Sequence, residues 1–384
     1  MSAKSSLTLY GSPPSLYSGK ARSYLRKAGI PFEERLHSHP DYSARILPAI
    51  KRFVIPVLET PDGEIVQDTT EIIEFLEARH SAPLGVYPES PRQKIIAMIL
   101  EMFGDEGMLR PAMHYRWNFP EENDYFISME FGRFMKADST EEEAYGLAAM
   151  PKAAMQKYLP GLGITEASIP TIEKNYQELL QALNAHLLTS PYLLGGRPTM
   201  ADFSLYGPMY AHLARDPAPE MLMKRTANRV WRWVERMTVA DADMPEFPFM
   251  ERETLADDAI SATLMGVLKI VGQHYAPEVI ALVDFINGYS DKNPDIEAGS
   301  PVITDANKRV LGRITVPLGD TTISVGARHY SLWMLQRIHD AYDGLTATER
   351  EAVDGVIQSA GLSAFTERRL KRRIERKNYT EVWA

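Results

Sequence analysis

The 384-residue chain contains no cysteine at all. This absence excludes disulfide bonds, metal sites held by thiolates and every enzyme whose nucleophile is a cysteine side chain. The sequence also lacks an uninterrupted apolar run of about 18 residues, which is the length needed to cross a membrane. Its first ten residues lack the apolar centre of a secretion signal. We therefore expect a cytoplasmic protein without a membrane partner.

Positively charged residues are fewer than negatively charged ones, since the chain has 42 lysines and arginines and 51 aspartates and glutamates. The resulting net charge of −9 is not typical of nucleic-acid-binding proteins, so we expect no nucleic-acid partner. The apolar content of 45% is ordinary for a globular protein. A chain of this length is long enough for two or three domains, each with its own core.

The motifs of several enzyme classes are also missing. The sequence has no phosphate-binding, dinucleotide-binding or G-x-S-x-G motif. His37 and His39 lie close together, but no third metal ligand accompanies them. The segment from Asp291 to Asp295 lacks the glycine and the final acidic residue of a calcium loop. We therefore expect no bound metal.

Residues 1–82 alternate strand and helix signals, which predicts a small α/β domain. A strand over 7–10 leads through the sequence Gly-Ser-Pro-Pro-Ser into a helix over 20–28. A Pro-Asp-Gly turn then predicts a hairpin, and the apolar residues that follow residue 70 mark one face of a helix. Strand, helix and hairpin are expected to share a single sheet.

Residues 91–244 have helical periodicity, which predicts an all-helical domain. Ser90 is suited to cap its first helix, with Pro91 at the first helical position. Thr199 and Asp202 have the spacing of a capping box. We therefore interpret Asp202 as a structural carboxylate.

Residues 245–384 form a third region, which we expect to be mostly helical with one β-hairpin. The hairpin should turn at residues 318–320, and a strongly basic helix should cover residues 366–377 with a solvated face. We expect this C-terminal extension to dock on the helical domain, where it would shape a substrate pocket or a dimer edge.

Four segments of the chain resemble the glutathione transferase family. In chain order they are "LTLYGSPPSLYSGKARSYLRKAGI", "VIPVLE", "DTTEIIEFLE" and "PYLLGGRPTMADFSL". The resemblance implies a thioredoxin-like, glutathione-binding domain over 1–82 and the family's all-helical domain over 91–244, followed by an additional extension over 245–384. It also implies a homodimeric detoxification enzyme that uses glutathione to attack a small apolar electrophile.

The resemblance gives five residues a role in holding glutathione. Pro56 stands where the family has a cis-proline, which turns the main chain of Ile55 toward a peptide-like ligand. Asp68 and Thr69 stand at a helix start, where the family holds the γ-glutamyl end and where free amides favour an anion. Arg52 stands where basic residues often bind the glycyl carboxylate. The alternatives are that Asp68 or Thr69 only caps the helix and that Arg52 is only a solvated charge.

Three hydroxyls, on Ser15, Tyr17 and Ser18, compete for the catalytic role. In serine-type members of the family, a hydroxyl just before the first helix hydrogen-bonds the glutathione sulfur, which favours the reactive thiolate. Ser15 matches that serine best. Tyr17 and Ser18 are alternatives, and Tyr10 matches the tyrosine of other classes. The family's proline is replaced by Leu16, so the choice stays open.

His114 and Tyr115 are predicted to line the pocket for the second substrate, between the two domains. The alternative is that these residues belong to the helical core, since aromatic residues at helical spacing are usually buried. Two other functions also stay open. One is a glutathione-dependent isomerase or lyase, and the other is a binding or scaffold protein that has kept the fold without turnover.

Overall fold

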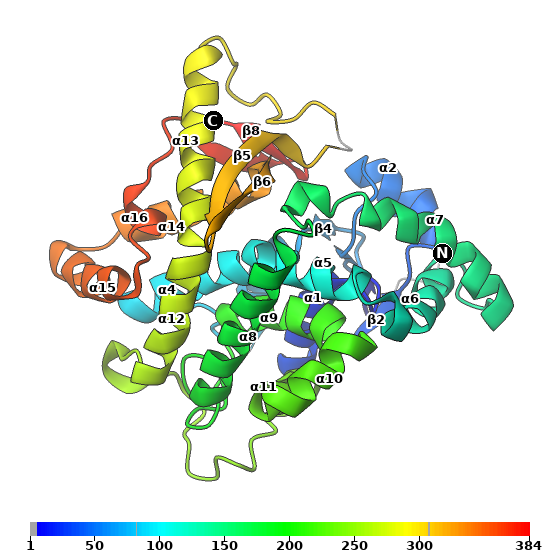
Figure 1. The fold of residues 1–384 in the computed structure, drawn as a ribbon, viewed down its shortest axis with the longest axis horizontal. Helices are drawn as coiled ribbons and strands as arrows, with labels where there is room; N and C mark the ends of the chain where they lie inside the picture. Colours follow the sequence, from blue (N-terminus) through cyan, green and yellow to red (C-terminus); the bar gives the residue numbers. More distant parts are fainter. Residues whose placement is uncertain (1–5, 82, 306–307) are drawn as a thin grey trace.

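The computed structural model describes residues 6–81, 83–305 and 308–384. Residues 1–5 and residue 82 of the expected first domain lie outside this part of the chain. Figure 1 shows the first domain in blue, the helical domain in cyan to green and the C-terminal extension in yellow to red. The predicted fold class is confirmed: a thioredoxin-like domain, an all-helical domain and a mostly helical extension.

The first domain builds a four-stranded sheet with helices around it. Its elements are β1 (Leu7–Tyr10), α1 (Leu16–Lys27), β2 (Phe32–Arg35), the π-helical turn η1 (Tyr42–Ile46), α2 (Leu47–Ile50), β3 (Val57–Glu59), β4 (Ile65–Gln67) and α3 (Thr69–Arg79). The strand order is β2-β1-β3-β4. β1 and β2 are parallel, whereas β3 pairs antiparallel with both β1 and β4.

The register of this sheet brings three chain junctions to one end. Tyr10 pairs with Val57, and Val57 pairs with Gln67. Neighbouring strands lie about 4.8 Å apart, so the end of β1, the start of β3 and the end of β4 lie within about 10 Å. The residues after β1, before β3 and after β4 therefore meet. We call this place the sheet corner and define it as residues 11–18, 52–56 and 68–70.

Helices build the second domain. They are α4 (Pro91–Met102), η2 (Phe103–Gly107), α5 (Leu109–Trp117), α6 (Pro120–Met135), α7 (Glu141–Gln156), η3 (Pro160–Leu162), α8 (Ile169–His186), α9 (Met200–Pro208), η4 (Met209–Leu213), α10 (Pro217–Thr226) and α11 (Asn228–Thr238). The predicted capping box is present, because Asp202 accepts hydrogen bonds from the amide and the hydroxyl of Thr199. Burial raises the pKa of Asp202 to about 6.

The C-terminal extension combines helices with two hairpins. Its elements are η5 (Ala256–Asp258), α12 (Ala262–His274), α13 (Ala276–Lys292), β5 (Val310–Leu318), β6 (Thr321–Arg328), α14 (His329–Asp343), α15 (Ala347–Ala360), α16 (Ala364–Glu367), β7 (Ile374–Lys377) and β8 (Thr380–Trp383). The hairpin predicted to turn at residues 318–320 is confirmed as β5–β6.

The predicted basic helix over 366–377 is wrong. α16 ends at Glu367, and the chain then forms the antiparallel hairpin β7–β8. Its turn residues, Asn378 and Tyr379, have φ angles of 49° and 65°, the left-handed conformation that a tight hairpin turn requires. The expected solvated face is also wrong at Arg376, whose side chain is only 4% exposed.

The extension docks on both other domains. α14 and α15 pack against α4, and α12 packs against α8, so one apolar core continues from the helical domain into the extension. Hydrogen bonds from α14 and from the β7–β8 hairpin also reach the first domain. Among residues 6–81, 83–305 and 308–384, no helix is both long enough and apolar enough to span a bilayer.

Candidate functional site

The sheet corner holds the residues expected to contact glutathione. The Ile55–Pro56 peptide bond is cis. Asp68 caps α3, because its Oδ1 accepts hydrogen bonds from the amides of Thr70 at 3.0 Å and Glu71 at 3.5 Å. In the described part of the chain, the main chain of Ile55 has no hydrogen-bond partner. An extended peptide therefore has a free backbone edge to pair with beside the start of α3.

Thr69 and Arg52 both have unused hydrogen-bonding capacity at this corner. Thr69 is 1% exposed, and its hydroxyl has no partner within the described residues. Arg52 donates from Nη1 to the carbonyl of Tyr379 at 3.0 Å, while its Nε has no partner there. Burial, together with the charge of Arg309, lowers the pKa of Arg52 to about 10. Buried polar groups are normally paired, so these two residues suit an anionic ligand.

Ser15 is the N-cap of α1. Its Oγ accepts a hydrogen bond from the amide of Ser18 at 3.2 Å, and its hydroxyl hydrogen has no acceptor among the residues described. Ser15 is also partly exposed, whereas Ser18 is fully buried. The Ser18 hydroxyl accepts from the amide of Ser12 at 3.2 Å, which fixes the loop before α1. Ser15 can therefore cap the helix and still donate outward.

The two tyrosines among the expected alternatives use their hydroxyls inside the protein. Tyr17 directs its hydroxyl to the carbonyl of Asp105 at 3.2 Å and to Glu106 Oε1 at 3.3 Å. Burial raises the pKa of Tyr17 well above its ordinary value. Tyr10 donates to Glu59 at 3.0 Å, and burial raises its pKa to about 12. Both tyrosines are therefore held as neutral phenols.

His114 and Tyr115 lie in the core of the helical domain. His114 is 1% exposed, and its Nε2 lies 3.0 Å from Glu173 Oε1. The Tyr115 ring stacks on Phe119 with 5.3 Å between the centroids. A cavity of about 50 Å³ lies between α5, α8 and α12, but neither residue lines it. Their surroundings match the core role given above as the alternative.

Two family models match the chain. The model described as glutathione S-transferase, N-terminal domain, matches residues 9–84, and the model described as glutathione S-transferase, C-terminal domain, matches residues 166–236. The chain belongs to the glutathione transferase family. The first match contains the whole sheet corner, and the extension lies beyond the second match.

Three solved structures illustrate what this glutathione transferase family member is similar to. A beta-etherase from Sphingobium sp. strain SYK-6 is 18% identical and covers 63% of this chain and 98% of its own, with a TM-score of 0.44. A transferase of Ceriporiopsis subvermispora in complex with glutathione is 16% identical, with coverages of 62% and 99% and a TM-score of 0.37. A theta class transferase from Xanthomonas axonopodis pv. citri with glutathione bound is 18% identical, with coverages of 65% and 99% and a TM-score of 0.35. No curated protein matches the sequence.

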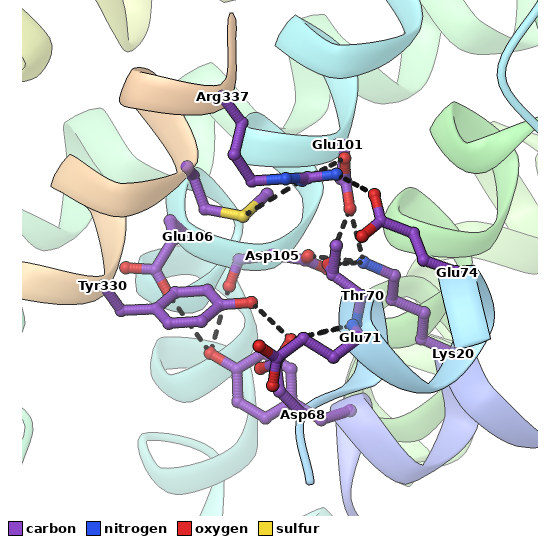
Figure 2. A network of polar contacts seen from close by, with 12 residues as sticks. Lys20, Asp68, Thr70, Glu71, Glu74, Glu101, Asp105, Glu106, Tyr330 and Arg337 are labelled. Atoms are coloured by element: carbon purple, nitrogen blue, oxygen red, sulfur yellow. Dashed lines mark hydrogen bonds and ion pairs between the residues drawn. The ribbon is translucent and has the colours of Figure 1, made fainter. Parts of the chain in front are cut away.

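A buried charge network beside the sheet corner of this family member was not expected from its sequence (Figure 2). Lys20 Nζ, on α1, lies 2.6 Å from Asp105 Oδ2, 3.1 Å from Glu101 Oε1 and 3.1 Å from the Thr70 hydroxyl. Arg337, on α14, reaches the second oxygen of Glu101 at 3.2 Å. The network therefore joins all three parts of the chain. Its signal in the sequence is Glu101, a carboxylate inside the apolar run "IIAMILEMF".

Burial and mutual charge set the ionisation of this network. Burial, with the charge of Glu101, raises the pKa of Asp105 to about 7 although Lys20 opposes the rise. Burial also acts to raise the pKa of Glu101, but Lys20 and Arg337 outweigh it and lower this pKa to about 2. Burial alone would lower the pKa of Lys20, whereas the two carboxylates raise it. Lys20 and Glu101 are therefore charged at neutral pH, while Asp105 titrates near it.

Replacing Asp105 with asparagine should flatten the pH dependence of stability. An unfolded aspartate titrates near pH 3.9, so from about pH 4 to 7 the folded chain keeps a proton that the unfolded chain has lost. The contribution of Asp105 to the free energy of unfolding of the wild type is therefore fully present below about pH 4. It is lost as the pH rises toward 7, at up to about 1.4 kcal/mol per pH unit. Urea unfolding measures the free energy of unfolding at pH 4.5 and at pH 7.5. The stability of Asp105→Asn relative to the wild type should be higher at pH 7.5 than at pH 4.5. Parallel changes, equal to those of the exposed control Asp295→Asn, would contradict this.

The extension covers the sheet corner. The Tyr330 hydroxyl, on α14, donates to Asp68 Oδ1 at 3.0 Å (Figure 2). Arg376, on β7, donates to Gln67 Oε1 at 2.9 Å. Tyr379, in the β7–β8 turn, accepts from Arg52 and donates from its hydroxyl to the carbonyl of Ile65 at 3.3 Å. We call α14 together with the β7–β8 hairpin the C-terminal cover.

Proposed function

We propose that the protein is a glutathione transferase in which the sheet corner binds glutathione and Ser15 stabilises its thiolate for attack on an apolar electrophile. The observation that carries this proposal is the register of the sheet. It gathers the N-cap of α1, the main chain before β3 and the start of α3 at one corner. These are the three places at which a tripeptide with a reactive sulfur would need partners.

Each charged end of glutathione has a partner of suitable chemistry at this corner. The γ-glutamyl carboxylate fits the unpartnered hydroxyl of Thr69 at the positive end of α3, and the ammonium fits Asp68. The cysteinyl main chain fits the free backbone edge of Ile55, and the glycyl carboxylate fits Arg52. The buried, unpartnered donor atoms of Thr69 and Arg52 support an anionic peptide ligand over a neutral one.

Ser15 then supplies the activation. A free thiol titrates near pH 8.5, so only a small fraction is nucleophilic at neutral pH. A hydrogen bond to the charged sulfur stabilises it by about 1.5–3 kcal/mol, which lowers the thiol pKa by about one to two units. The thiol proton leaves to solvent, the thiolate forms a bond to the electrophilic carbon, and the leaving group departs with the bonding electrons. The positive end of α1 favours the same charge.

Titration calorimetry with glutathione tests the binding part of this proposal. The wild type should release or absorb heat on association, and Thr69→Val should weaken binding about tenfold, because it loses one hydrogen bond to a charged group. Thr60→Val is the matched control, since Thr60 lies in the β3–β4 turn at the opposite end of the sheet. No association at millimolar glutathione, in either the wild type or a variant with a weakened cover, would contradict the proposal.

The C-terminal cover supports a second function, namely a binding or scaffold protein without turnover, because it occupies the proposed substrate corner. Retention on immobilised glutathione together with turnover of a generic aromatic electrophile would support the enzyme, whereas retention alone would support the binding protein. A glutathione-dependent isomerase would regenerate glutathione and therefore consume none in net, whereas a lyase would turn over its own substrate without acting on the generic electrophile. Homodimeric assembly and location in the cytoplasm stay predictions.

A further inference from the structure

We propose that the C-terminal cover is an intramolecular competitor of glutathione, so that docking of the cover and binding of the tripeptide at the sheet corner exclude each other. This inference rests on the proposed function. It adds that the extension regulates access to the site, and it names the groups that stand in for the ligand.

The first stand-in is the hydroxyl of Tyr330. It donates to Asp68 Oδ1, the carboxylate that would otherwise receive the ammonium group of the γ-glutamyl end. Asp68 is 9% exposed, so an ammonium that binds Oδ1 competes with the Tyr330 hydroxyl for this oxygen. Because both groups are hydrogen-bond donors to one buried carboxylate, Tyr330 satisfies Asp68 while the ligand is absent.

The second stand-in is the carbonyl of Tyr379. It accepts from Arg52, where the proposed function places the glycyl carboxylate. A neutral carbonyl is a weaker partner for a guanidinium than a carboxylate, and it leaves the Arg52 Nε without a partner. A tripeptide carboxylate would therefore satisfy Arg52 better than the cover does.

The third point of exclusion is space along the backbone edge. The Tyr379 side chain packs with Ile55 and Ile65 against one small apolar cluster of the first domain. Its hydroxyl donates to the carbonyl of Ile65 at 3.3 Å. The Tyr379 side chain therefore lies along β4, while its carbonyl reaches Arg52 at the sheet corner, so the β7–β8 turn takes up space next to the backbone edge that an extended ligand needs.

The cover is also anchored away from these three points. Arg337 pairs with Glu74 and Glu101, and Arg376 lies 3.3 Å from Glu71. Inside the cover, Glu381 lies 2.8 Å from His329 Nε2 and thereby joins β8 to the start of α14. The ion pairs of Arg337 and Arg376 with the rest of the protein favour the docked state. The apparent affinity for glutathione is then reduced by the fraction of molecules in which the corner is open.

The test compares two tyrosine-to-phenylalanine variants on the same helix in the full chain. Tyr330→Phe removes the hydrogen bond from the cover to Asp68. Tyr342→Phe is the matched control, because its hydroxyl donates to Asp354 at 2.8 Å within the extension. Glutathione affinity is measured by calorimetry for both variants and the wild type. Hydrogen exchange of the β7–β8 amides is measured with and without saturating glutathione.

Competition predicts about tenfold tighter glutathione binding by Tyr330→Phe, the effect of weakening the docked state by one hydrogen bond to a charged group. It also predicts unchanged binding by Tyr342→Phe, and faster exchange of the β7–β8 amides when glutathione is added. Equal affinity in all three chains, with exchange of the hairpin unchanged or slower, would overturn the competition while leaving the proposed function in place. If no chain bound glutathione even though Tyr330→Phe exchanged its β7–β8 amides faster, the proposed function would be overturned, and the competition with it.

Discussion

Replacing Lys20 with methionine is expected to lower the free energy of unfolding by about 3–5 kcal/mol. The ammonium group is fully buried and is shared by the carboxylates of Asp105 and Glu101. Methionine fills a similar volume, so the loss arises from two buried carboxylates that keep too little positive charge. A buried charge that loses its partner costs far more than the pair contributes, because the remaining ion keeps its desolvation penalty.

Urea unfolding of the full chain measures this loss. Lys174→Met is the control, since Lys174 is 74% exposed and meets Glu178 only at 4.0 Å, so its loss should stay below about 1 kcal/mol. Adding Asp105→Asn to Lys20→Met should restore part of the stability, because it removes one of the uncompensated carboxylates. A Lys20→Met variant as stable as the control would show that Lys20 is not needed to compensate the buried carboxylates of Asp105 and Glu101. A double variant with no recovery would assign the loss to packing.

The first domain could be predicted because its signals are local in the sequence. The Pro-Asp-Gly turn sets the β3–β4 hairpin, and a short carboxylate before an apolar helical face marks the cap at Asp68. The position of Pro56 came from the family resemblance, which also implied the cis bond that the structure shows. Each of these features depends on fewer than ten consecutive residues.

The C-terminal cover could not be predicted in the same way. The β7–β8 turn is Asn378-Tyr379. Such a turn is usually marked in the sequence by Asn-Gly, and here tyrosine stands in the second position, so the usual signal is missing. Arg376 reads as one more charge in a basic run, and its burial depends on Gln67 and Glu71, about 300 residues earlier in the chain. The local sequence therefore predicted a helix with a solvated face over 366–377. Tertiary contacts produce a hairpin with a buried Arg376 instead.

The charge network shows the same limit for the helical domain. Lys20 reads as one of several basic residues on a surface helix, because nothing near it in the sequence indicates a partner. Its partners Glu101 and Asp105 lie some 80 residues later, on α4 and η2. A carboxylate inside an apolar run, such as Glu101, is a signal of a buried ion, but only the packing of α1 against the helical domain identifies its counter-charge.

Replacing Ser15 with glycine is expected to lower kcat/KM for glutathione conjugation about 10- to 100-fold at pH 7. Loss of the hydrogen bond to sulfur should raise the pKa of the bound thiol by about one to two units, which lowers the thiolate fraction correspondingly. Glycine is preferred to alanine here because Ser15 also caps α1, and glycine at an N-cap costs only a few tenths of a kcal/mol. The pH profile of kcat/KM and the ultraviolet absorbance of the bound thiolate both report the shift.

Two further substitutions separate chemistry at Ser15 from helix capping. Ser15→Thr keeps both the cap and a hydroxyl, so its pH profile should stay close to that of the wild type. Ser18→Ala removes a buried hydroxyl that accepts from the amide of Ser12, so it should lower stability and leave the thiol pKa unchanged. If Ser15→Gly kept the wild-type profile, the sulfur would have to be stabilised by the amides at the start of α1 alone, since the Tyr17 hydroxyl is already directed to Asp105 and Glu106.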